Sequence, residues 1–283
     1  MIATDTYTIG HSPDPDDAFM FYAIAAEKID LRGYKFRHQL EDIETLNERA
    51  MRGELEISAV SIHAYAHITA KYALLSCGAS MGDGYGPLLV CPHEMQTSDA
   101  REWLRGKTIA VPGTMTSAFL ALQLYLGEFQ HVVVPFDQIF NSVKSRRAEA
   151  GLIIHEGQLT YARAGFHKII DLGEWWTSRT GLPLPLGGNV LRKDMPLNVQ
   201  RDLAAILRES IDYGLAHREE AVRHSMPYAR DMDDKLASRF IGMYVNEYTR
   251  DYGERGREAI RRFLGDARAA GYVAREVTVE FVE

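Results

Sequence analysis

The sequence predicts an α/β protein of two lobes with a cleft between them. Strand-like and helical segments alternate from residue 7 to residue 154, a pattern typical of a parallel or mixed sheet with helices on its faces. The alternation falls into two βα series, over residues 7–91 and 108–154. The chain then becomes mainly helical over residues 196–270. The chain thus has two βα halves that are joined by two chain crossings, and a helical C-terminal segment follows them. This order favours a two-lobed protein.

The first series has short apolar, β-branched or aromatic runs that are separated by helical segments. We expect strands over residues 7–10, 34–39, 57–60 and 87–91, and helices over residues 17–27, 41–53 and 62–72. A glycine-rich loop over residues 82–86 precedes the last of these strands.

The second series follows the same pattern. We expect strands over residues 108–111, 131–134 and 151–154, helices over residues 117–127 and 138–146, and, after a strand over 189–192, helices over 196–217, 219–229, 233–246 and 254–270. Residues 181–188 are rich in Pro and Gly and predict a stiff crossover between the lobes. Residues 276–282 alternate in polarity and are interpreted as an edge strand. The predicted first lobe is residues 1–92 plus 188–283, and the predicted second lobe is residues 93–187.

Composition and charge narrow the class of protein. The 283 residues exceed the usual size of a single core, and 46% hydrophobic with 25% charged residues is typical of a soluble globular chain. The formal net charge of −7 disfavours nucleic acid or an anionic membrane as a partner and favours a small molecule. The absence of a leader-like N-terminus and of a long apolar run predicts a cytoplasmic protein. Oligomeric state is left open.

His155 is the leading candidate for a catalytic residue. The apolar run Gly151-Leu-Ile-Ile154 ends abruptly in His155, Glu156 and Gly157. In an open α/β sheet the ligand crevice lies just beyond the carboxyl ends of the strands, so a histidine there faces the substrate. Imidazole titrates near neutrality and can therefore accept or donate a proton. The alternative is a capping histidine that is satisfied within the protein, and the sequence leaves this open.

Two further strand ends carry polar groups. Ser12-Pro-Asp-Pro-Asp-Asp17 opens the first helix, where Ser and Asp cap free N–H groups, and capping explains most of this motif, Asp16 included. Val111 to Phe119 is another strand, turn and helix start with hydroxyls at Thr114, Thr116 and Ser117, so a ligand carboxylate could dock there. Ser61 adds a hydroxyl at a third strand end. Simple helix capping is the alternative at each of these positions.

Other motifs indicate structure more than chemistry. His63 and His67 have the i, i+4 spacing of a metal-binding pair, but no acidic or cysteine partner accompanies them, so we predict no metal site. Trp175, Trp176 and Tyr161 are predicted to pack the second lobe rather than to line a pocket. Cys77 and Cys91 are too few for a disulfide framework and are expected to be reduced thiols. No nucleotide-binding loop or nucleophile elbow is present.

Four segments taken together resemble a known enzyme family. They are Ser12-Pro-Asp-Pro-Asp-Asp-Ala-Phe-Met-Phe-Tyr-Ala23, Leu40-Glu-Asp-Ile-Glu-Thr-Leu-Asn47, Gly151-Leu-Ile-Ile-His-Glu156, and Asp171-Leu-Gly-Glu-Trp-Trp176 through Gly181-Leu-Pro-Leu-Pro-Leu-Gly187. From about residue 10 to residue 252 the chain is similar to the 1,4-dihydroxy-6-naphthoate synthases, which act late in the futalosine route to menaquinone. The resemblance implies a type II periplasmic-binding-protein fold used as a cytoplasmic enzyme, with no metal and no organic cofactor.

The resemblance also implies an activity and a set of site residues. The family cleaves a carbon–carbon bond of cyclic dehypoxanthinyl futalosine, with His155 at the position of the catalytic base. Asp17, Ser61 and Thr116 fall on cleft-lining positions, Ser117 adds a hydroxyl beside them, and Leu186 and Gly187 would offer backbone groups to a carboxylate substrate. Two rivals share the fold: a non-catalytic solute-binding or sensory protein, and chorismate dehydratase of the same pathway, which the His-Glu-Gly and Trp-Trp segments fit less well.

This chain departs from the family pattern in the first motif. Asp14, Asp16 and Ala18 stand where the family usually has Cys, Asn and Thr. At an effective dielectric constant of 20 and about 8 Å, each extra carboxylate would repel an anionic ligand by ~2 kcal/mol. We therefore predict that Asp14 and Asp16 point away from the ligand carboxylate or bind ligand hydroxyls.

Overall fold

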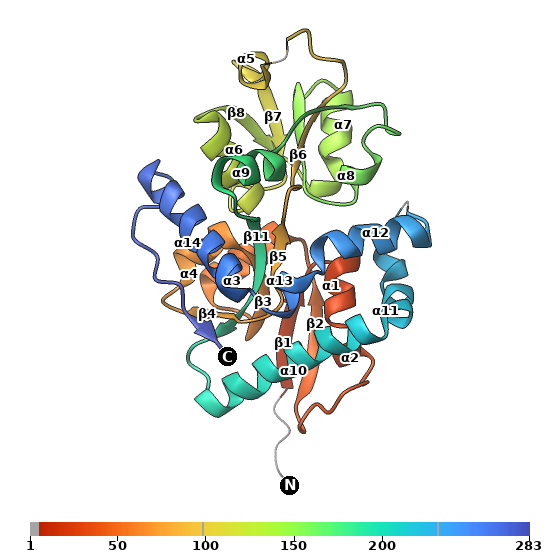
Figure 1. Ribbon diagram of the computed structural model, residues 1–283, viewed down its shortest axis with the longest axis vertical. Helices are drawn as coiled ribbons and strands as arrows, with labels where there is room; N and C mark the ends of the chain where they lie inside the picture. The colour runs from red at the N-terminus through yellow and green to blue at the C-terminus, as the bar shows by residue number, and fades with distance from the viewer. Residues whose placement is uncertain (1–5, 98, 231) are drawn as a thin grey trace.

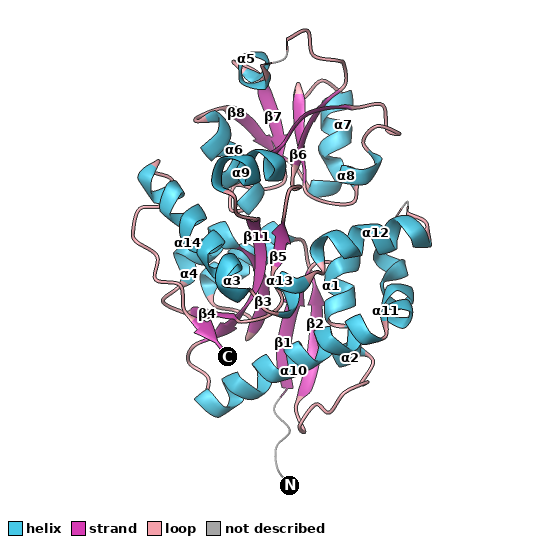
Figure 2. Ribbon diagram, in the orientation of Figure 1, coloured by secondary structure: helices cyan, strands magenta, loops and turns pink. Residues whose placement is uncertain are grey.

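The computed structural model describes residues 6–97, 99–230 and 232–283 and has two lobes, which lie one above the other in Figure 1. The larger sheet has the strand order β12-β4-β11-β3-β1-β2, with β5 beside β11, and the smaller has the order β10-β6-β9-β7-β8. Figure 2 shows helices flanking both sheets. The predicted two-lobed α/β architecture is confirmed.

The first lobe is built around the larger sheet. Its strands are β1 (Thr6–His11), β2 (Lys35–Leu40), β3 (Ile57–Ser61), β4 (Tyr72–Leu75), β5 (Ser80–Gly82), β11 (Leu184–Arg192) and β12 (Phe281–Val282). Its helices are α1 (Pro15–Met20), α2 (Tyr22–Ala25), α3 (Ile43–Arg52), α4 (Ile62–Ile68), α10 (Leu197–Ala216), α11 (Arg218–Ser225), α12 (Asp234–Tyr244), α13 (Glu247–Arg250) and α14 (Gly253–Ala269), with the short 3₁₀ helix η2 (Met226–Tyr228). The C-terminal helices pack back on this lobe, with α10 against α1 and α2 and with α14 against β11.

The second lobe is built around the smaller sheet. Its strands are β6 (Leu88–Cys91), β7 (Thr108–Val111), β8 (Gln130–Val133), β9 (Ala150–Ile153) and β10 (His167–Asp171). Its helices are α5 (Ala100–Leu104), α6 (Ser117–Leu126), α7 (Ile139–Lys144), α8 (Gly157–Thr160) and α9 (Leu172–Thr180), with the 3₁₀ helix η1 (Phe136–Gln138).

Local sequence signals explain several element boundaries. The Asp42 carboxylate accepts hydrogen bonds from the N–H groups of Glu44 and Thr45 and so caps α3, which ends at Gly53 with a φ of 77°. The strands β3 and β9 are buried along their whole length, as expected for strands that are covered on both faces.

The structure corrects the lobe boundaries. The prediction put residues 88–92 in the first lobe, but β6 pairs with β9 and β10 of the second sheet. The prediction also treated 181–188 as a crossover, but β11 starts at Leu184 and pairs with β5 of the first sheet. Pro185 can sit there because the register of this pairing shifts between Pro185 and Gly187, as at a β-bulge. The two crossings therefore lie near residues 83–87 and 181–183.

Some elements differ from the prediction. The helix expected over 62–72 ends at Ile68, and β4 begins at Tyr72, because the buried residues Tyr72, Ala73 and Leu74 pair with β11. The helix expected over 17–27 is split into α1 and α2 at Phe21, which leaves helical geometry with φ −92° and ψ 3°. The edge strand expected over 276–282 is reduced to β12. The strands β4, β5 and β10 and the helices α5, α8, α9 and α13 were not predicted.

The strand directions place several chain segments at one level between the lobes. In the first sheet β1 and β3 are parallel, so their carboxyl ends, which lead into Ser12 and Ser61, lie at the same edge. In the second sheet β7 and β9 are parallel, so the turn after Val111 and the segment at His155 also share an edge. Both edges face the gap between the lobes, and they carry the candidate site. Within the described residues, no helix has the length and apolarity needed to cross a membrane.

Candidate active site

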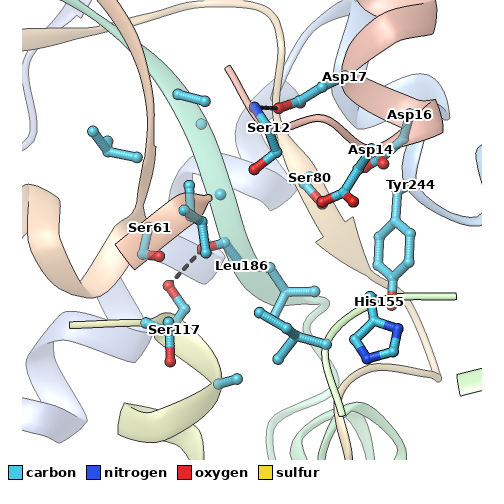
Figure 3. Close-up of a pocket in the computed structure, with 18 of the residues that line it drawn as sticks. Ser12, Asp14, Asp16, Asp17, Ser61, Ser80, Ser117, His155, Leu186 and Tyr244 are labelled. Carbon is cyan, nitrogen blue, oxygen red and sulfur yellow. Dashed lines mark hydrogen bonds between the residues drawn. The ribbon is translucent and has the colours of Figure 1, made fainter. Parts of the chain in front are cut away.

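A pocket lies between the two lobes and is drawn in Figure 3. The space between its lining residues is about 910 Å³, and this value includes the open mouth of the pocket. Most of the candidate site residues line it, namely Asp17, Ser61, Thr116, Ser117, His155, Leu186 and Gly187, whereas the Thr114 hydroxyl is not among its lining residues. The fold thus brings together five chain segments that are far apart in the sequence, and the roles of these residues stay predictions.

His155 follows β9 and is nine-tenths buried, with 10% of its side chain exposed. Its ring meets the rings of Phe136 and Phe140 edge-on, at centroid distances of 5.6 and 6.2 Å. The N–H of Gly157 donates to Nδ1 over 3.0 Å, whereas Nε2 has no hydrogen-bond partner among the described residues. Nδ1 therefore accepts a hydrogen bond in the way that the capping alternative predicts, and the catalytic role of His155 stays a prediction.

Three carboxyl groups of the first motif line the pocket on the first-lobe side. The Asp17 carboxylate accepts from the N–H of Ser12 over 2.6 Å, and the Asp16 carboxyl contacts N–H groups of its own helix turn. Asp14 precedes α1, and its side chain makes no capping hydrogen bond. Asp16 also lines the pocket, so pure capping by Asp16 stays a prediction, and Asp14 is available for other contacts.

Burial changes the acidity of these groups. Burial, followed by the neighbouring charges of Asp16 and Glu156, raises the pKa of Asp14 to about 7, although Arg230 opposes the shift. Burial and their mutual proximity likewise raise the pKa values of Asp16 and Asp17. This side of the pocket is therefore a place where carboxyl groups hold protons close to neutral pH.

Hydroxyl groups line the opposite side of the pocket, as Figure 3 shows for Ser61 and Ser117. Ser61 precedes α4, but its hydroxyl makes no capping hydrogen bond. Instead the buried Asn47 holds it, because Asn47 Oδ1 accepts from the Ser61 N–H over 2.8 Å and Asn47 Nδ2 donates to Ser61 Oγ over 3.1 Å. The capping alternative for Ser61 is wrong, and its side chain is fixed by a neighbouring helix.

The start of α6 completes the hydroxyl side. Thr116 Oγ1 accepts from the N–H of Phe119 over 3.1 Å, so Thr116 both caps α6 and lines the pocket. Ser117 Oγ donates to the carbonyl oxygen of Leu186, which is therefore already engaged within the protein. Apart from the N–H of Phe119, which Thr116 caps, the first-turn N–H groups of α6 have no partner inside the helix and can receive an anionic ligand group.

Several contacts join the lobes around the pocket. Tyr244 of α12 donates to Gln158 Oε1 of α8, and burial raises the pKa of Tyr244 well above its usual range. Arg230, just before α12, donates to both carboxylate oxygens of Glu156 at 3.1 and 3.3 Å. On the hydroxyl side the carboxylate of Glu44 accepts from the N–H of Met115 over 3.0 Å. The two lobes are thus in contact on both sides of the cleft.

The remaining candidates take structural positions. Trp176 is fully buried, donates to the Pro183 carbonyl oxygen over 3.1 Å and packs on Phe263 of α14, while Trp175 packs on Tyr125 of the second lobe. Both tryptophans therefore pack rather than line the pocket, but Trp176 packs against the first lobe and not only within the second, as was predicted. Tyr161 packs beside a cluster of apolar side chains in the second lobe. The rings of His63 and His67 are 5.6 Å apart, and among the described residues no group of three metal-binding side chains forms. Cys77 and Cys91 are buried free thiols.

Some residues of the pocket were missed from the sequence. They include Ser12, Ser80, Phe136, Gln158, Asn189 and Tyr244. Asn189 is a polar residue inside a buried strand, and that position could have marked it. Tyr244 had no such signal, since it belongs to an amphipathic helix whose place over the cleft depends on the tertiary fold.

Comparison with known proteins identifies the fold and the family. At 14% identity and a TM-score of 0.72, over 98% of this chain and 97% of that chain, the structure resembles a Candida albicans protein, the CA3427 gene product, described as having the periplasmic-binding-protein fold. It also resembles the alkanesulfonate-binding protein SsuA of Xanthomonas axonopodis pv. citri, at 10% identity and a TM-score of 0.69, over 97% of this chain and 96% of that one. At these identities the likeness shows the fold alone.

More similar proteins cover nearly the whole chain. The structure of protein AF1704 from Archaeoglobus fulgidus is 43% identical with a TM-score of 0.89, over 96% of this chain and 99% of that chain. A 1,4-dihydroxy-6-naphthoate synthase of Thermus thermophilus is 39% identical over 94% of this chain and 95% of its own length. Another of the same name, from Streptomyces coelicolor, is 37% identical over 96% of both. Since the family model for menaquinone biosynthesis also matches residues 7–269, this chain belongs to the menaquinone biosynthesis family.

Proposed function

We propose that the protein is a 1,4-dihydroxy-6-naphthoate synthase, a cofactor-independent carbon–carbon lyase that acts on cyclic dehypoxanthinyl futalosine. The observation that carries the proposal is the position of His155: its Nε2 is buried, has no hydrogen-bond partner among the described residues and belongs to a ring that lines the pocket. The names of the two curated relatives support the choice of reaction.

In the proposed reaction His155 is the general base. It takes a proton from the sugar-derived portion of the substrate, and the electron pair released opens the ring and breaks the carbon–carbon bond to the departing fragment. The bicyclic product becomes aromatic, which drives the step. A positioned base typically contributes a factor of 10² to 10⁴, or roughly 3 to 5 kcal/mol of the barrier, so orientation and aromatisation supply the remainder.

The two sides of the pocket fit the two ends of such a substrate. No Lys or Arg is among the described residues that line the pocket, so a ligand carboxylate would depend on the hydroxyls of Ser61, Thr116 and Ser117 and on the N-terminal dipole of α6. The carboxyl groups of Asp14, Asp16 and Asp17 suit sugar hydroxyls, and Figure 3 places them on the side of His155. This orientation would bring the sugar-derived portion to the base.

The orientation also accounts for the carboxyl groups that are particular to this chain. Asp14 and Asp16 would lie away from the naphthoate carboxylate, as their charge requires. A protonated carboxyl can donate to a sugar oxygen and an ionised one can accept from a sugar hydroxyl, so groups that titrate near neutral pH serve both purposes. A complex in which either side chain faces the ligand carboxylate unpaired would contradict this assignment.

The test is to incubate the purified protein with cyclic dehypoxanthinyl futalosine and, separately, with chorismate, and to separate the products by chromatography. We expect release of 1,4-dihydroxy-6-naphthoate from the first compound and no change in the second. Dehydration of chorismate would identify the protein as the related dehydratase. Saturable binding of either compound without any product would identify a solute-binding protein, and in both cases the proposal fails.

A further inference from the structure

The Nδ1 atom of His155 has two neighbours that require opposite protonation states. The backbone N–H of Gly157 donates to Nδ1 over 3.0 Å, and Glu156 Oε2 lies 3.5 Å from the same atom. A neutral imidazole carries one N–H and one acceptor nitrogen. The Gly157 contact therefore requires the proton on Nε2, whereas a hydrogen bond to Glu156 requires it on Nδ1.

This choice decides what the ring offers to the pocket. In the Nε2–H form the nitrogen that has no partner among the described residues is a hydrogen-bond donor and cannot accept a proton. In the Nδ1–H form Nε2 has a free lone pair and can act as a base. Because the Gly157 distance is the shorter one, the ligand-free ring is held mainly in the Nε2–H form.

Arg230 competes with His155 for the Glu156 carboxylate. Its Nη1 lies 3.1 and 3.3 Å from the two oxygens of Glu156 and 3.5 Å from Asp14 Oδ1, and its guanidinium stacks 4.5 Å above the Phe136 ring. Burial disfavours the Glu156 carboxylate, but its contacts with His155 and Arg230 outweigh burial and lower the pKa of Glu156. An ionised Glu156 therefore stands between a cation and an imidazole.

The groups around this arrangement come from both lobes. Asp14 and Asp16 of the first motif face Glu156, and Arg230 reaches across from the segment before α12. Phe136 and Phe140 shield the His155 ring on its own lobe. Since Arg230 belongs to the first lobe and Glu156 to the second, their contact depends on how the lobes sit.

We propose that Glu156 and Arg230 are positioning residues that set the tautomer of His155. Glu156 favours the Nδ1–H form, in which Nε2 can act as a base. Arg230 binds the Glu156 carboxylate and so weakens its hydrogen bond to Nδ1, and the Nε2–H form therefore predominates without ligand. The inference rests on the proposed function only in giving His155 the role of base, and the tautomer itself is measured without turnover.

The experiment uses the full chain labelled with ¹⁵N-histidine and long-range ¹H–¹⁵N NMR at about pH 8, where a free imidazole is neutral. His155→Gln identifies the His155 signals. We expect the unchanged chain to be mainly Nε2–H. E156Q should shift the ring further to Nε2–H, and R230Q should raise the ratio of Nδ1–H to Nε2–H about fivefold, the effect of one ordinary hydrogen bond.

The controls separate tautomer control from simple loss of an interlobe ion pair. Arg179 on α9 pairs with Asp266 on α14 at 3.6 Å and also joins the lobes, so R179Q should leave the His155 ratio unchanged. R230K keeps the positive charge and should keep the ratio close to that of the unchanged chain. Thermal unfolding of every variant reports folding, and R230K replaces R230Q as the second arm if R230Q does not fold.

The proposal is overturned if E156Q and R230Q leave the ratio unchanged or shift it in the same direction. If R230K has to serve as the second arm, the proposal is also overturned when two results occur together. These are an Nδ1–H to Nε2–H ratio in R230K that differs from that of the unchanged chain, and a ratio in E156Q that equals it. In turnover, E156Q should lower kcat about tenfold with little change in KM, because a misplaced proton affects the transition state. If His155→Gln keeps its activity, the proposed function fails. The NMR ratios still test the control of the tautomer, so the two failures can be told apart.

Discussion

The hydroxyl of Ser117 in the second lobe donates to the carbonyl oxygen of Leu186 on β11 of the first sheet, with 2.5 Å between the two oxygens. The same hydroxyl accepts from the N–H of His63 in α4 over 3.2 Å. One side chain at the start of α6 therefore joins two elements of the first lobe. Ser117 also lines the pocket, so a residue that joins the two lobes is also a predicted ligand contact.

Ser117→Ala should destabilise the protein by about 1 to 3 kcal/mol, because it leaves the buried N–H of His63 without its partner. Ligand binding should weaken as well. Urea unfolding and calorimetric titration measure the two effects. Ser58→Ala is a matched control, since Ser58 is equally buried but donates only to the adjacent Ala59 carbonyl oxygen. Equal loss of ligand affinity in both variants would contradict the role given to Ser117.

Asn47→Ala should raise KM more than it lowers kcat, because the Asn47 side chain holds both the backbone N–H and the hydroxyl of Ser61. The unpaired buried N–H should also cost about 1 to 3 kcal/mol of unfolding free energy. Steady-state kinetics and chemical denaturation check this. The exposed Asn141, which contacts only Gln138 in its own helix region, gives the control Asn141→Ala. An unchanged KM in Asn47→Ala would show that Ser61 needs no such support.

His11 should make the fold less stable in acid. Burial, followed by the adjacent His38 ring at 3.0 Å, lowers the pKa of His11 from 6.5 to about 3. Between these values the unfolded chain binds a proton that the folded chain does not, so the contribution is complete above pH 6.5 and is lost as the pH falls.

The expected size of this effect is about 1 to 2 kcal/mol of unfolding free energy between pH 7 and pH 5. His11→Gln should reduce the acid-induced loss by that amount, and the exposed His131→Gln should not. Urea unfolding at both pH values measures the difference. An acid-induced loss in His11→Gln as large as in the unchanged chain would rule out His11 as its source.

Asp14→Asn should stabilise the protein at pH 8 and have little effect at pH 4. The raised pKa of Asp14, about 7, means that its favourable contribution is complete below pH 3.8 and is lost as the pH rises through 7. Because 23% of the side chain is exposed, we expect about 1 to 3 kcal/mol rather than the full value of the shift. Asp234→Asn, at an exposed helix start, is the control. The idea fails if the two Asp14→Asn measurements agree across pH.

The sequence was most informative where a local pattern decides the structure. The buried runs Ile57–Ser61 and Ala150–Ile153 were found as strands, and their carboxyl ends led to Ser61 and His155. The sequence was least informative where pairing partners decide. The helix predicted over 62–72 ends early, and Tyr72–Leu75, for which no strand was predicted, forms β4 because β11 and β12 offer partners on both sides.

The site residues also divide into those that a local pattern marks and those that only the tertiary fold brings into place. His155, Thr116 and Ser61 follow or precede elements that could be recognised one at a time. Arg230 and Asn47 carry no local mark, since the value of each lies in a residue far along the chain: Glu156 for Arg230 and Ser61 for Asn47. Such contacts depend on how the two lobes and the C-terminal helices pack together. The periodicity of the sequence does not carry this information.

The most direct test of the proposed base is His155→Gln, assayed for turnover of cyclic dehypoxanthinyl futalosine and for the increase in Tm that this ligand produces. We expect turnover to fall by about 10² to 10⁴ while the ligand-induced Tm increase is largely kept, because a base acts chiefly in the transition state. The exposed His167→Gln should behave like the unchanged chain. Near-normal turnover in His155→Gln would contradict the account.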